Sequence, residues 1–275
     1  MLHKLNNNLH GVYDISSDDY HASEGISRSS LMHFIKTPFH YWNKFINPDS
    51  KSEILNNDSI KIGSAFHTYI LEPEKFNKQY VVCEKRDKRT KEGKLYYDQL
   101  NLISNGRQLI NQDDFEKLKL MSDNFMSHAQ IRNLIEGGQY EKSLYWTDPH
   151  TNLLCKVRPD IWQNGFICDI KTASSADYRS FQSSLYKYGY YIQCAMISEA
   201  FKHIFNIEMK DFIFIVIENE WPHAFAIYQF EEALLEHSIS IFTNKLLELK
   251  ECLNKNEWPS YKTQIVSLPS FLLGE

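Results

Sequence analysis

Two aspartates and a lysine with the spacing of a metal-binding site lie in the segment 156–171, which reads KVRPDIWQNGFICDIK. Asp160 closes a first apolar run, and Asp169 and Lys171 lie two residues apart near the end of a second. Because side chains alternate along a strand, Asp169 and Lys171 share one face and Ile170 points to the other. The Asn-Gly pair between the two runs predicts a tight hairpin, which brings Asp160 beside the other two charged residues.

Two carboxylates held this close repel each other unless a cation lies between them. Oxygen ligands without a thiolate suit magnesium or manganese. A lysine beside such a site stabilises charge that develops on a phosphate, or helps to deprotonate a water molecule. The alternative is a surface Asp–Lys pair without chemistry, because short motifs of this kind are common. The apolar run from Phe166 to Ile170 favours the metal site, since charged residues seldom end a buried strand without a partner.

His67 and Glu141 are the other candidates for this site. His67 lies in an apolar helix predicted over 60–71, where a lone histidine is either a buried structural residue or a metal ligand. Glu141 lies on a predicted strand and either points toward the acidic pair or forms a surface ion pair with Lys142 or Lys156. We favour the surface ion pair for Glu141.

The densest basic run is KRDKRTKEGK, at residues 85–94. It follows a short strand and precedes a helix, so it is a loop. It is either a solvated surface or a place where phosphates are held, and both interpretations stay open. We nominate as DNA contacts the loop residues Lys85, Arg86, Lys88 and Arg89, together with Lys156 and Arg158 beside the acidic pair.

The composition bounds the class of protein. The chain has 275 residues and a formal net charge of −5, which confines any nucleic-acid contact to local patches. Its five scattered cysteines form no CxxC pair and indicate reduced thiols in a cytoplasmic protein. No signal peptide or membrane-spanning run is recognised, so no membrane partner is expected. We expect one domain over residues 25–275, preceded by a loose lead-in over 1–24.

The remaining pattern predicts an α/β sandwich with a mixed sheet flanked by helices. Three strands at 140–146, 153–160 and 166–171 predict an antiparallel meander. The apolar run 212–217 predicts a buried central strand, with 223–229 as its neighbour. Helices are expected at 27–35, 38–45, 60–71, 112–128, 131–136, 178–205 and 231–253, and Ser27 is expected to be the N-cap of the first. The aromatic residues of 38–45 are interpreted as core packing.

Several motifs, in the same order along the chain, resemble the RecE-type exodeoxyribonucleases (exonuclease eight) of the PD-(D/E)xK superfamily. They are Gly63-Ser-Ala-Phe-His67, Leu71-Glu-Pro73, Leu144-Tyr-Trp146, Cys155 to Asp160, Asp169-Ile-Lys171-Thr172, Tyr190-x-x-Gln193, Glu257-Trp-Pro259 and Ser267-Leu-Pro269. The match extends from about Gly11 to the C-terminal tail and corresponds to the nuclease domain alone. It is far more specific than the two aspartates and the lysine by themselves.

The resemblance implies a restriction-endonuclease-like core and a magnesium site, at which manganese would substitute. His67, Asp160 and Asp169 would bind the metal, with the Ile170 carbonyl as a further ligand. On this basis alone, His67 changes from a core residue to a ligand. The iron–sulfur branch of the superfamily needs a set of cysteines that this chain lacks.

The resemblance also implies roles for residues around the metal. Lys171 would act on the attacking water or on the phosphate, and Thr172 belongs to the same motif. Tyr190 and Gln193 are three residues apart, so they share a helix face, and they would line the DNA path. Both acids and the lysine are intact, which argues against a catalytically silent DNA-binding module.

The function implied is resection of linear double-stranded DNA ends for recombination, in a phage or prophage setting. The family digests from 5′ to 3′ and leaves a 3′ single strand for an annealing partner of the RecT type. In this family the subunits form a closed ring, and the DNA duplex passes through its central channel. The alternatives within enzymes are an endonuclease or a single-strand nuclease on the same fold.

Overall fold

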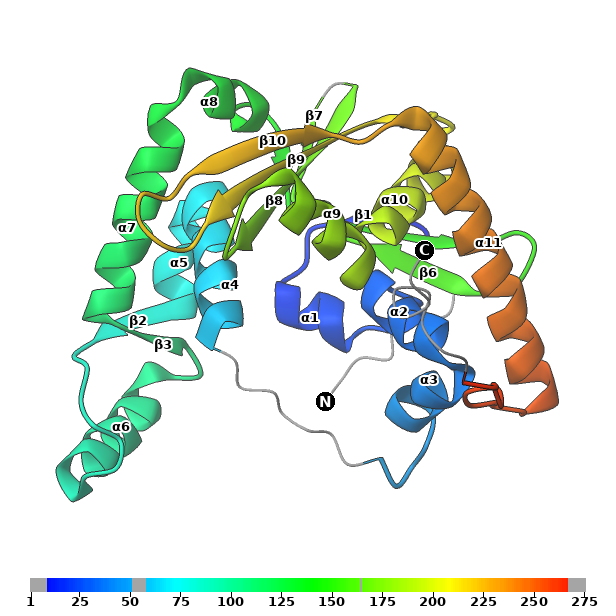
Figure 1. Ribbon diagram of the computed structural model, residues 1–275. Coiled ribbons are helices and arrows are strands. Elements are labelled where there is room, and N and C mark those ends of the chain that lie inside the picture. The colour runs from blue at the N-terminus through cyan, green and yellow to red at the C-terminus, as the bar shows by residue number, and fades with distance from the viewer. Residues whose placement is uncertain (1–8, 51–57, 164, 267–275) are drawn as a thin grey trace.

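A five-stranded mixed sheet forms the centre of the molecule (Figure 1). The computed structural model describes residues 9–50, 58–163 and 165–266. The strand order is β10-β9-β8-β7-β4, with β4 at Gln139–Tyr140, β7 at Ile161–Gln163, β8 at Phe166–Ala173, β9 at Asp211–Glu218 and β10 at Phe225–Gln229. β8 and β9 are parallel, and the other neighbours are antiparallel. The predicted α/β class with a mixed sheet is therefore confirmed.

The predicted hairpin and central strand are present in this sheet. β7 and β8 pair with Gln163 opposite Phe166, which confirms a tight hairpin; Asn164 in its turn lies outside the described residues. β9 is buried along most of its length, as its continuous apolar run predicts, and β10 is its antiparallel neighbour. Since β8 and β9 are parallel, the chain between them crosses over the sheet through helices.

Helices cover both faces of the sheet. α4 (Asp58–Leu71), α7 (Gln112–Ser127) and α8 (Ala129–Ile135) pack on the face to which Cys168 and Ile170 of β8 point. α9 (Tyr178–Lys187) and α10 (Tyr190–Phe205) pack on the other face, where they meet Ile167, and α11 (Glu232–Lys255) covers α10 (Figure 1). Asp169 and Lys171 therefore share the face of α10, as strand alternation predicts.

The predicted three-strand meander is wrong, because its strands belong to two sheets. β5 (Ser143–Thr147) and β6 (Leu154–Val157) pair with β1 (Gly11–Tyr13) in a separate three-stranded sheet. The chain leaves this sheet after Val157 and begins β7 at Ile161. Pro159 lies between the two strands and has no N–H to donate to a ladder, which explains the interruption.

Residues 9–24, the described part of the segment expected as a loose lead-in, are structured. They contain β1 and the short helix α1 (Ser17–Ala22). Leu9 and Tyr20 are buried against Tyr145 of β5. Residues 9–20 therefore pack against the three-stranded sheet.

The remaining elements form two peripheral groups. α2 (Arg28–Lys36) and α3 (Pro38–Phe45) pack together, and α2 begins with a capping box at Ser27, as predicted. In α3 Tyr41 is buried, but Phe39 and Phe45 are exposed, so the core interpretation of its aromatic residues holds only in part. α5 (Pro73–Gln79) leads into the parallel pair β2 (Tyr80–Cys83) and β3 (Gln108–Asn111), and α6 (Lys91–Ser104) between them projects from the body (Figure 1).

The single helix predicted over 178–205 is two helices. Gly189 separates α9 from α10 and has a left-handed backbone (φ 70°), which glycine adopts without steric cost. A Cβ atom at this position would lie 2.3 Å from Met32 Sδ, so α2 leaves no space for a side chain there. In the parts of the chain that the structure describes, no helix is both long and apolar enough to cross a membrane.

Candidate active site

The candidate site lies where the chain passes between the two larger sheets. Two connections cross there: one joins β4 to β5 through Glu141, and the other joins β6 to β7 through Asp160. The Glu141 N–H donates a hydrogen bond of 3.0 Å to the Asp160 carbonyl, which links these two connections. Glu141 has a left-handed backbone (φ 52°), a costly conformation for a residue with a side chain and one that clusters at functional sites.

Three potential metal ligands converge at this crossing. A ring nitrogen of His67 and carboxylate oxygens of Glu141 and Asp160 all lie within 4.8 Å of one another. Asp160 Oδ2 is 3.4 Å from His67 Nδ1 and accepts a hydrogen bond of 2.8 Å from the Ile170 N–H. The backbone of β8 therefore orients the Asp160 carboxylate, and α4 supplies the histidine.

Asp169 and Lys171 form a buried ion pair next to these ligands. Asp169 is 4% exposed, and its Oδ2 contacts Lys171 Nζ. Gln193 of α10 donates from Nε2 to Asp169 Oδ1 over 2.6 Å. Lys171 Nζ also lies 4.8 Å from the centroid of the Tyr190 ring. The structure thus brings Tyr190 and Gln193 against the acid and the lysine. Asp169 does not belong to the group of ligand atoms that lie within 4.8 Å of one another around His67.

The site carries a surplus of negative charge. Burial, reinforced by Asp160, raises the pKa of Asp169. The same two causes raise the pKa of Glu141 to about 7, although Arg158 opposes the shift. Burial disfavours the ammonium form of Lys171, but Asp169 and Asp160 outweigh it and hold the pKa of Lys171 above its usual value. Neighbouring carboxyl groups with raised pKa values indicate a place where a cation would relieve repulsion.

The donor set fits a hard divalent cation. Two carboxylates and an imidazole offer oxygen and nitrogen ligands at mutual distances that one ion can span, and this chemistry suits magnesium or manganese. Cys168 is adjacent to Asp169 in sequence, but it is buried in the core on the opposite face of β8. No thiolate therefore takes part.

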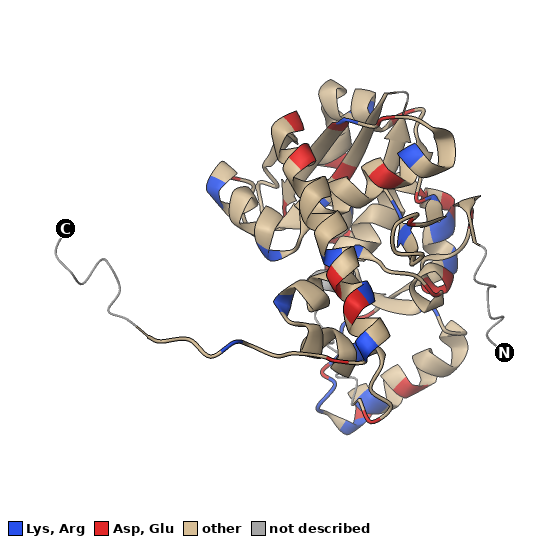
Figure 2. Ribbon diagram, turned by 90° about the vertical axis from the view of Figure 1, so that its right-hand side faces the viewer, with Lys and Arg blue, Asp and Glu red and all other residues tan. Residues whose placement is uncertain are grey.

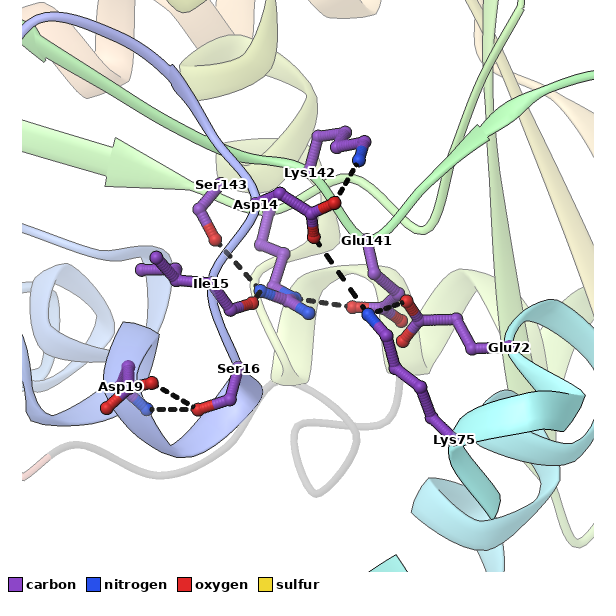
Figure 3. Close-up of polar contacts among 10 residues, drawn as sticks. Asp14, Ile15, Ser16, Asp19, Glu72, Lys75, Glu141, Lys142 and Ser143 are labelled. Carbon is purple, nitrogen blue, oxygen red and sulfur yellow. Dashed lines mark hydrogen bonds and ion pairs between the residues drawn. The ribbon is translucent and has the colours of Figure 1, made fainter. Parts of the chain in front are cut away.

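An arginine holds Glu141 from the side of the three-stranded sheet. Arg158 Nε donates to Glu141 Oε2 over 2.6 Å. Its Nη1 donates to the Ile15 carbonyl and to Ser143 Oγ, each over 2.9 Å. Figure 3 shows Ile15 and Ser143 grouped beside Glu141. The Glu141 carboxylate is thus positioned between a fixed cation and the Asp160–His67 pair.

Asp14 connects the N-terminal segment to this part of the site (Figure 3). Lys142 Nζ donates to Asp14 Oδ2 over 2.7 Å, and Lys75 of α5 lies 3.9 Å from Asp14 Oδ1 and contacts Glu72. The hydrogen bond from Lys142 lowers the pKa of Asp14. The segment between β1 and α1 is therefore joined to α5 as well as to the strand that follows Glu141.

Two basic residues predicted to contact DNA are turned inward instead. Lys156 is 4% exposed, and its ammonium donates to the carbonyls of Tyr20 and Ser23 over 2.7 and 2.6 Å. Arg158 is bound to Glu141 and to the N-terminal segment as described above. Both cations hold residues 15–23 next to the site, and their assignment as DNA contacts is corrected.

The basic loop lies apart from the acidic site, on the projecting part formed by β2, α6 and β3 (Figure 1). Three of its cations are in exposed ion pairs, which are Lys85–Asp113, Arg86–Glu84 and Arg89–Asp87. Lys88 Nζ lies 4.8 Å from the centroid of the Tyr97 ring. The local carboxylates offset part of the charge of this loop, so its phosphate-binding role stays a prediction.

Glu141 is where the sequence-based preference is wrong. Its expected surface partners are engaged elsewhere, Lys142 with Asp14 and Lys156 with backbone carbonyls. Thr172, which belongs to the motif of Asp169 and Lys171, faces α4: a Cβ atom added at Gly63 would lie 2.9 Å from Thr172 Oγ1. Arg28 was not singled out, although its guanidinium lies 5.7 Å from the centroid of the Tyr190 ring. No local sequence signal reports these contacts, because each joins distant segments.

Comparison with solved structures gives a fold match over nearly the whole chain. A crystal structure of a "Putative exonuclease" from Eubacterium rectale matches with a TM-score of 0.62 and 14% sequence identity, over 95% of this chain and 98% of that chain. At this identity the similarity shows a shared fold. A search among curated proteins finds no match.

A protein-family model matches residues 27–268 and carries the description "PDDEXK-like domain of unknown function (DUF3799)". The matched span contains His67, Glu141, Asp160, Asp169 and Lys171. A mixed sheet flanked by helices, with the acids and the lysine on one hairpin, is the restriction-endonuclease-like arrangement that the motifs predict. The chain therefore belongs to the family of PDDEXK-like domains known as DUF3799 and has the PD-(D/E)xK nuclease fold.

Proposed function

We propose that this protein is a magnesium-dependent exodeoxyribonuclease that resects linear double-stranded DNA from 5′ to 3′. The observation that carries the proposal is the convergence of His67, Glu141 and Asp160 beside the Asp169–Lys171 pair. Membership of a PDDEXK-like family and the fold shared with a protein described as a "Putative exonuclease" support it.

Some of these side chains would bind the metal, and Lys171 would stabilise negative charge on the phosphate. His67, Glu141 and Asp160 would hold the ion, and Asp169 would join them when its carboxylate turns from Lys171. When bound, the ion supplies an activated water molecule and neutralises charge on the scissile phosphate. Lys171 is held in its ammonium form by two carboxylates, so it is suited to stabilise negative charge on a phosphate oxygen rather than to take up a proton.

Gln193 and Tyr190 are positioning residues in this account. Gln193 fixes the rotamer of Asp169 through its 2.6 Å hydrogen bond. Tyr190 lies against Lys171 Nζ and limits the directions in which the ammonium can point. Both arise from the first turns of α10, so that helix places the pair against the site.

Labelled DNA substrates test the exonuclease proposal. We expect linear duplex to be digested in magnesium, with the 5′ label released as mononucleotide first, and EDTA to stop digestion. A covalently closed circle should remain intact, because it offers no end. Cleavage of closed circles as fast as linear duplex would instead support an endonuclease.

The proposal extends to assembly and to a partner. A ring of subunits around the duplex would explain a requirement for free ends and would multiply weak contacts made by each acidic chain. The 3′ single strand would then pass to an annealing protein of the RecT type. Light scattering should give a mass of several subunits, and a strict monomer would contradict the ring.

A further inference from the structure

The break between α9 and α10 presents a tyrosine at the surface next to the active site. Gly189 ends the run of helix, so Tyr188 and Tyr190 lie on either side of a turn instead of on successive positions of one helix. Their ring centroids are 5.9 Å apart, with planes inclined by 32°. Tyr190 is half-buried, whereas Tyr188 is 49% exposed.

Tyr188 is one aromatic ring away from Lys171. Lys171 Nζ lies 4.8 Å from the centroid of the Tyr190 ring, and Tyr190 in turn contacts Tyr188. The two rings therefore lead from the buried ion pair to solvent. A ligand bound on the Tyr188 ring, the outer of the two, would therefore extend to the candidate metal site.

Two basic side chains, Lys187 and Arg28, lie next to Tyr188. Lys187 Nζ lies 5.3 Å from the centroid of the Tyr188 ring. Arg28 Nη1 donates to the Tyr188 carbonyl over 3.1 Å, and the Arg28 guanidinium lies 5.7 Å from the centroid of Tyr190. Within residues 9–50, 58–163 and 165–266, neither cation has a carboxylate within 4.0 Å. They differ in this from Arg86 and Arg89 of the basic loop, which are neutralised by neighbours.

An exposed ring beside two cations that have no carboxylate partner in the described part of the chain fits a nucleic-acid strand whose bases are unpaired. Aromatic side chains stack on single bases, while arginine and lysine follow the phosphates. In an intact duplex the base faces are covered by neighbouring base pairs, so the ring would find no face to stack on.

We propose that Tyr188, with Arg28 and Lys187, forms a subsite that stacks an unpaired nucleotide of the strand engaged at the adjacent metal site. This inference rests on the proposed nuclease function. The subsite would hold a base next to the scissile phosphate after that strand has left the duplex. Tyr188 would then be a positioning residue that acts by binding and touches no reacting atom.

Fluorescence anisotropy with DNA that is not digested tests the subsite. The parent chain carries Asp160→Asn, and the probes are a fluorescein-labelled oligothymidylate and a fluorescein-labelled duplex dumbbell. Both ends of the dumbbell are closed by non-nucleotide linkers, so that it holds no unpaired base. Tyr188→Ala should weaken oligothymidylate binding about 10-fold, as expected for the loss of one stacked base. Tyr188→Phe should restore it, because a phenyl ring keeps the stacking face. Dumbbell binding should be unchanged in both variants.

Matched controls separate stacking from charge and from folding. Tyr261→Ala removes another exposed tyrosine, on the C-terminal segment against His40, and should leave binding unchanged. Arg28→Gln should reduce the slope of log affinity against log salt concentration by about 0.7, the value for one phosphate on a single strand. Thermal midpoints of all variants should agree with the parent.

Several outcomes would overturn the subsite. They are parent-like oligothymidylate binding by Tyr188→Ala, an equal loss of binding to the dumbbell, or no binding of the oligonucleotide by the parent. Failure of the nuclease proposal would be seen separately, as wild-type protein that releases no nucleotides from linear duplex.

Discussion

Lys171 contacts Asp169 and His67 contacts Asp160, so the loss of each should have different consequences. His67→Ala removes one ligand and should weaken magnesium affinity about 10-fold, with partial rescue of cleavage by excess manganese. Lys171→Ala should leave metal affinity within about twofold but reduce kcat by about 100-fold, since its charge acts on the transition state. Titration calorimetry and steady-state cleavage distinguish the two. Unchanged metal affinity in His67→Ala would return the histidine to a structural role.

Glu141 links metal binding to pH. Its pKa is raised to about 7 by burial and by Asp160, so below pH 7 the metal-free carboxyl is protonated and must lose a proton before it can bind an ion. Magnesium affinity should therefore rise between pH 6 and pH 8 by about 10-fold in the wild type, with proton release. Glu141→Gln should bind more weakly and lose most of this pH dependence. Calorimetry in buffers with different ionisation enthalpies measures both quantities, and an unchanged pH profile in the variant would remove Glu141 from the site.

At the scale of elements, the close approach of α4 to β8 positions His67. A Cβ atom at Gly63 would lie 2.9 Å from Thr172 Oγ1, although alanine is favoured over glycine inside a helix by about 1 kcal/mol. Gly63→Ala should therefore push α4 from β8 and weaken metal affinity by about threefold to 10-fold, even as helix propensity improves. Adding Thr172→Ala should relieve the contact and recover affinity. Additive losses in the double variant would show that the two residues are not coupled.

Lys156 connects β6 to α1, and its burial makes stability depend on pH. Burial lowers the pKa of Lys156 to about 8 in the folded protein, below the value of an exposed lysine. The cost of burying the ammonium is fully present below pH 8 and is relieved as pH rises from 8 toward 10.5, because the folded state loses the proton first. The unfolding free energy of the wild type, relative to Lys156→Met, should rise by about 1–2 kcal/mol across this window. Urea titrations at both ends test it, and a constant difference would contradict the buried ammonium.

The parts of the fold that could be predicted from sequence are those that local rules determine. The β7–β8 hairpin follows from an Asn-Gly turn, the β9 strand from a continuous apolar run, and the α2 cap from Ser27. The same hairpin brings Asp160 close to the strand that carries Asp169, as the sequence predicts; the role of the two residues as metal ligands stays a prediction.

The errors have physical causes that the sequence pattern does not report. Pro159 interrupts a strand whose apolar pattern continues, so β6 and β7 lie in different sheets. Gly189 divides a helix because Met32 of α2, distant in sequence, fills the space beside it. Glu141 reaches His67 and Asp160 through pairing of β4 with β7, and no motif signals that pairing. The same pairing places Glu141 beside Arg158. Arg158 therefore donates a hydrogen bond to Glu141 and is not free to bind a phosphate.

At the scale of the whole molecule, a chain with a net negative charge must bind DNA through a few local groups of basic residues. The net charge is −5, and basic and acidic residues are interspersed along the ribbon (Figure 2). With Lys156 and Arg158 turned inward, Arg28 and Lys187 remain as cations beside Tyr190 and Tyr188 that have no carboxylate partner among the described residues. The described residues after α11 rest on α3 through Trp258 and then extend away from the body (Figure 2).

The central claim is that the acidic cluster at Asp160 binds a metal and cleaves DNA. The most direct test measures release of acid-soluble nucleotides from uniformly labelled linear duplex by the wild type and by Asp160→Asn, in magnesium and in EDTA. We predict release by the wild type in magnesium alone, and a loss of at least about 100-fold in Asp160→Asn with an unchanged thermal midpoint, because one ligand charge is removed and an oxygen acceptor for the Ile170 N–H is kept. Equal release by the folded variant, or release that persists in EDTA, would contradict the claim.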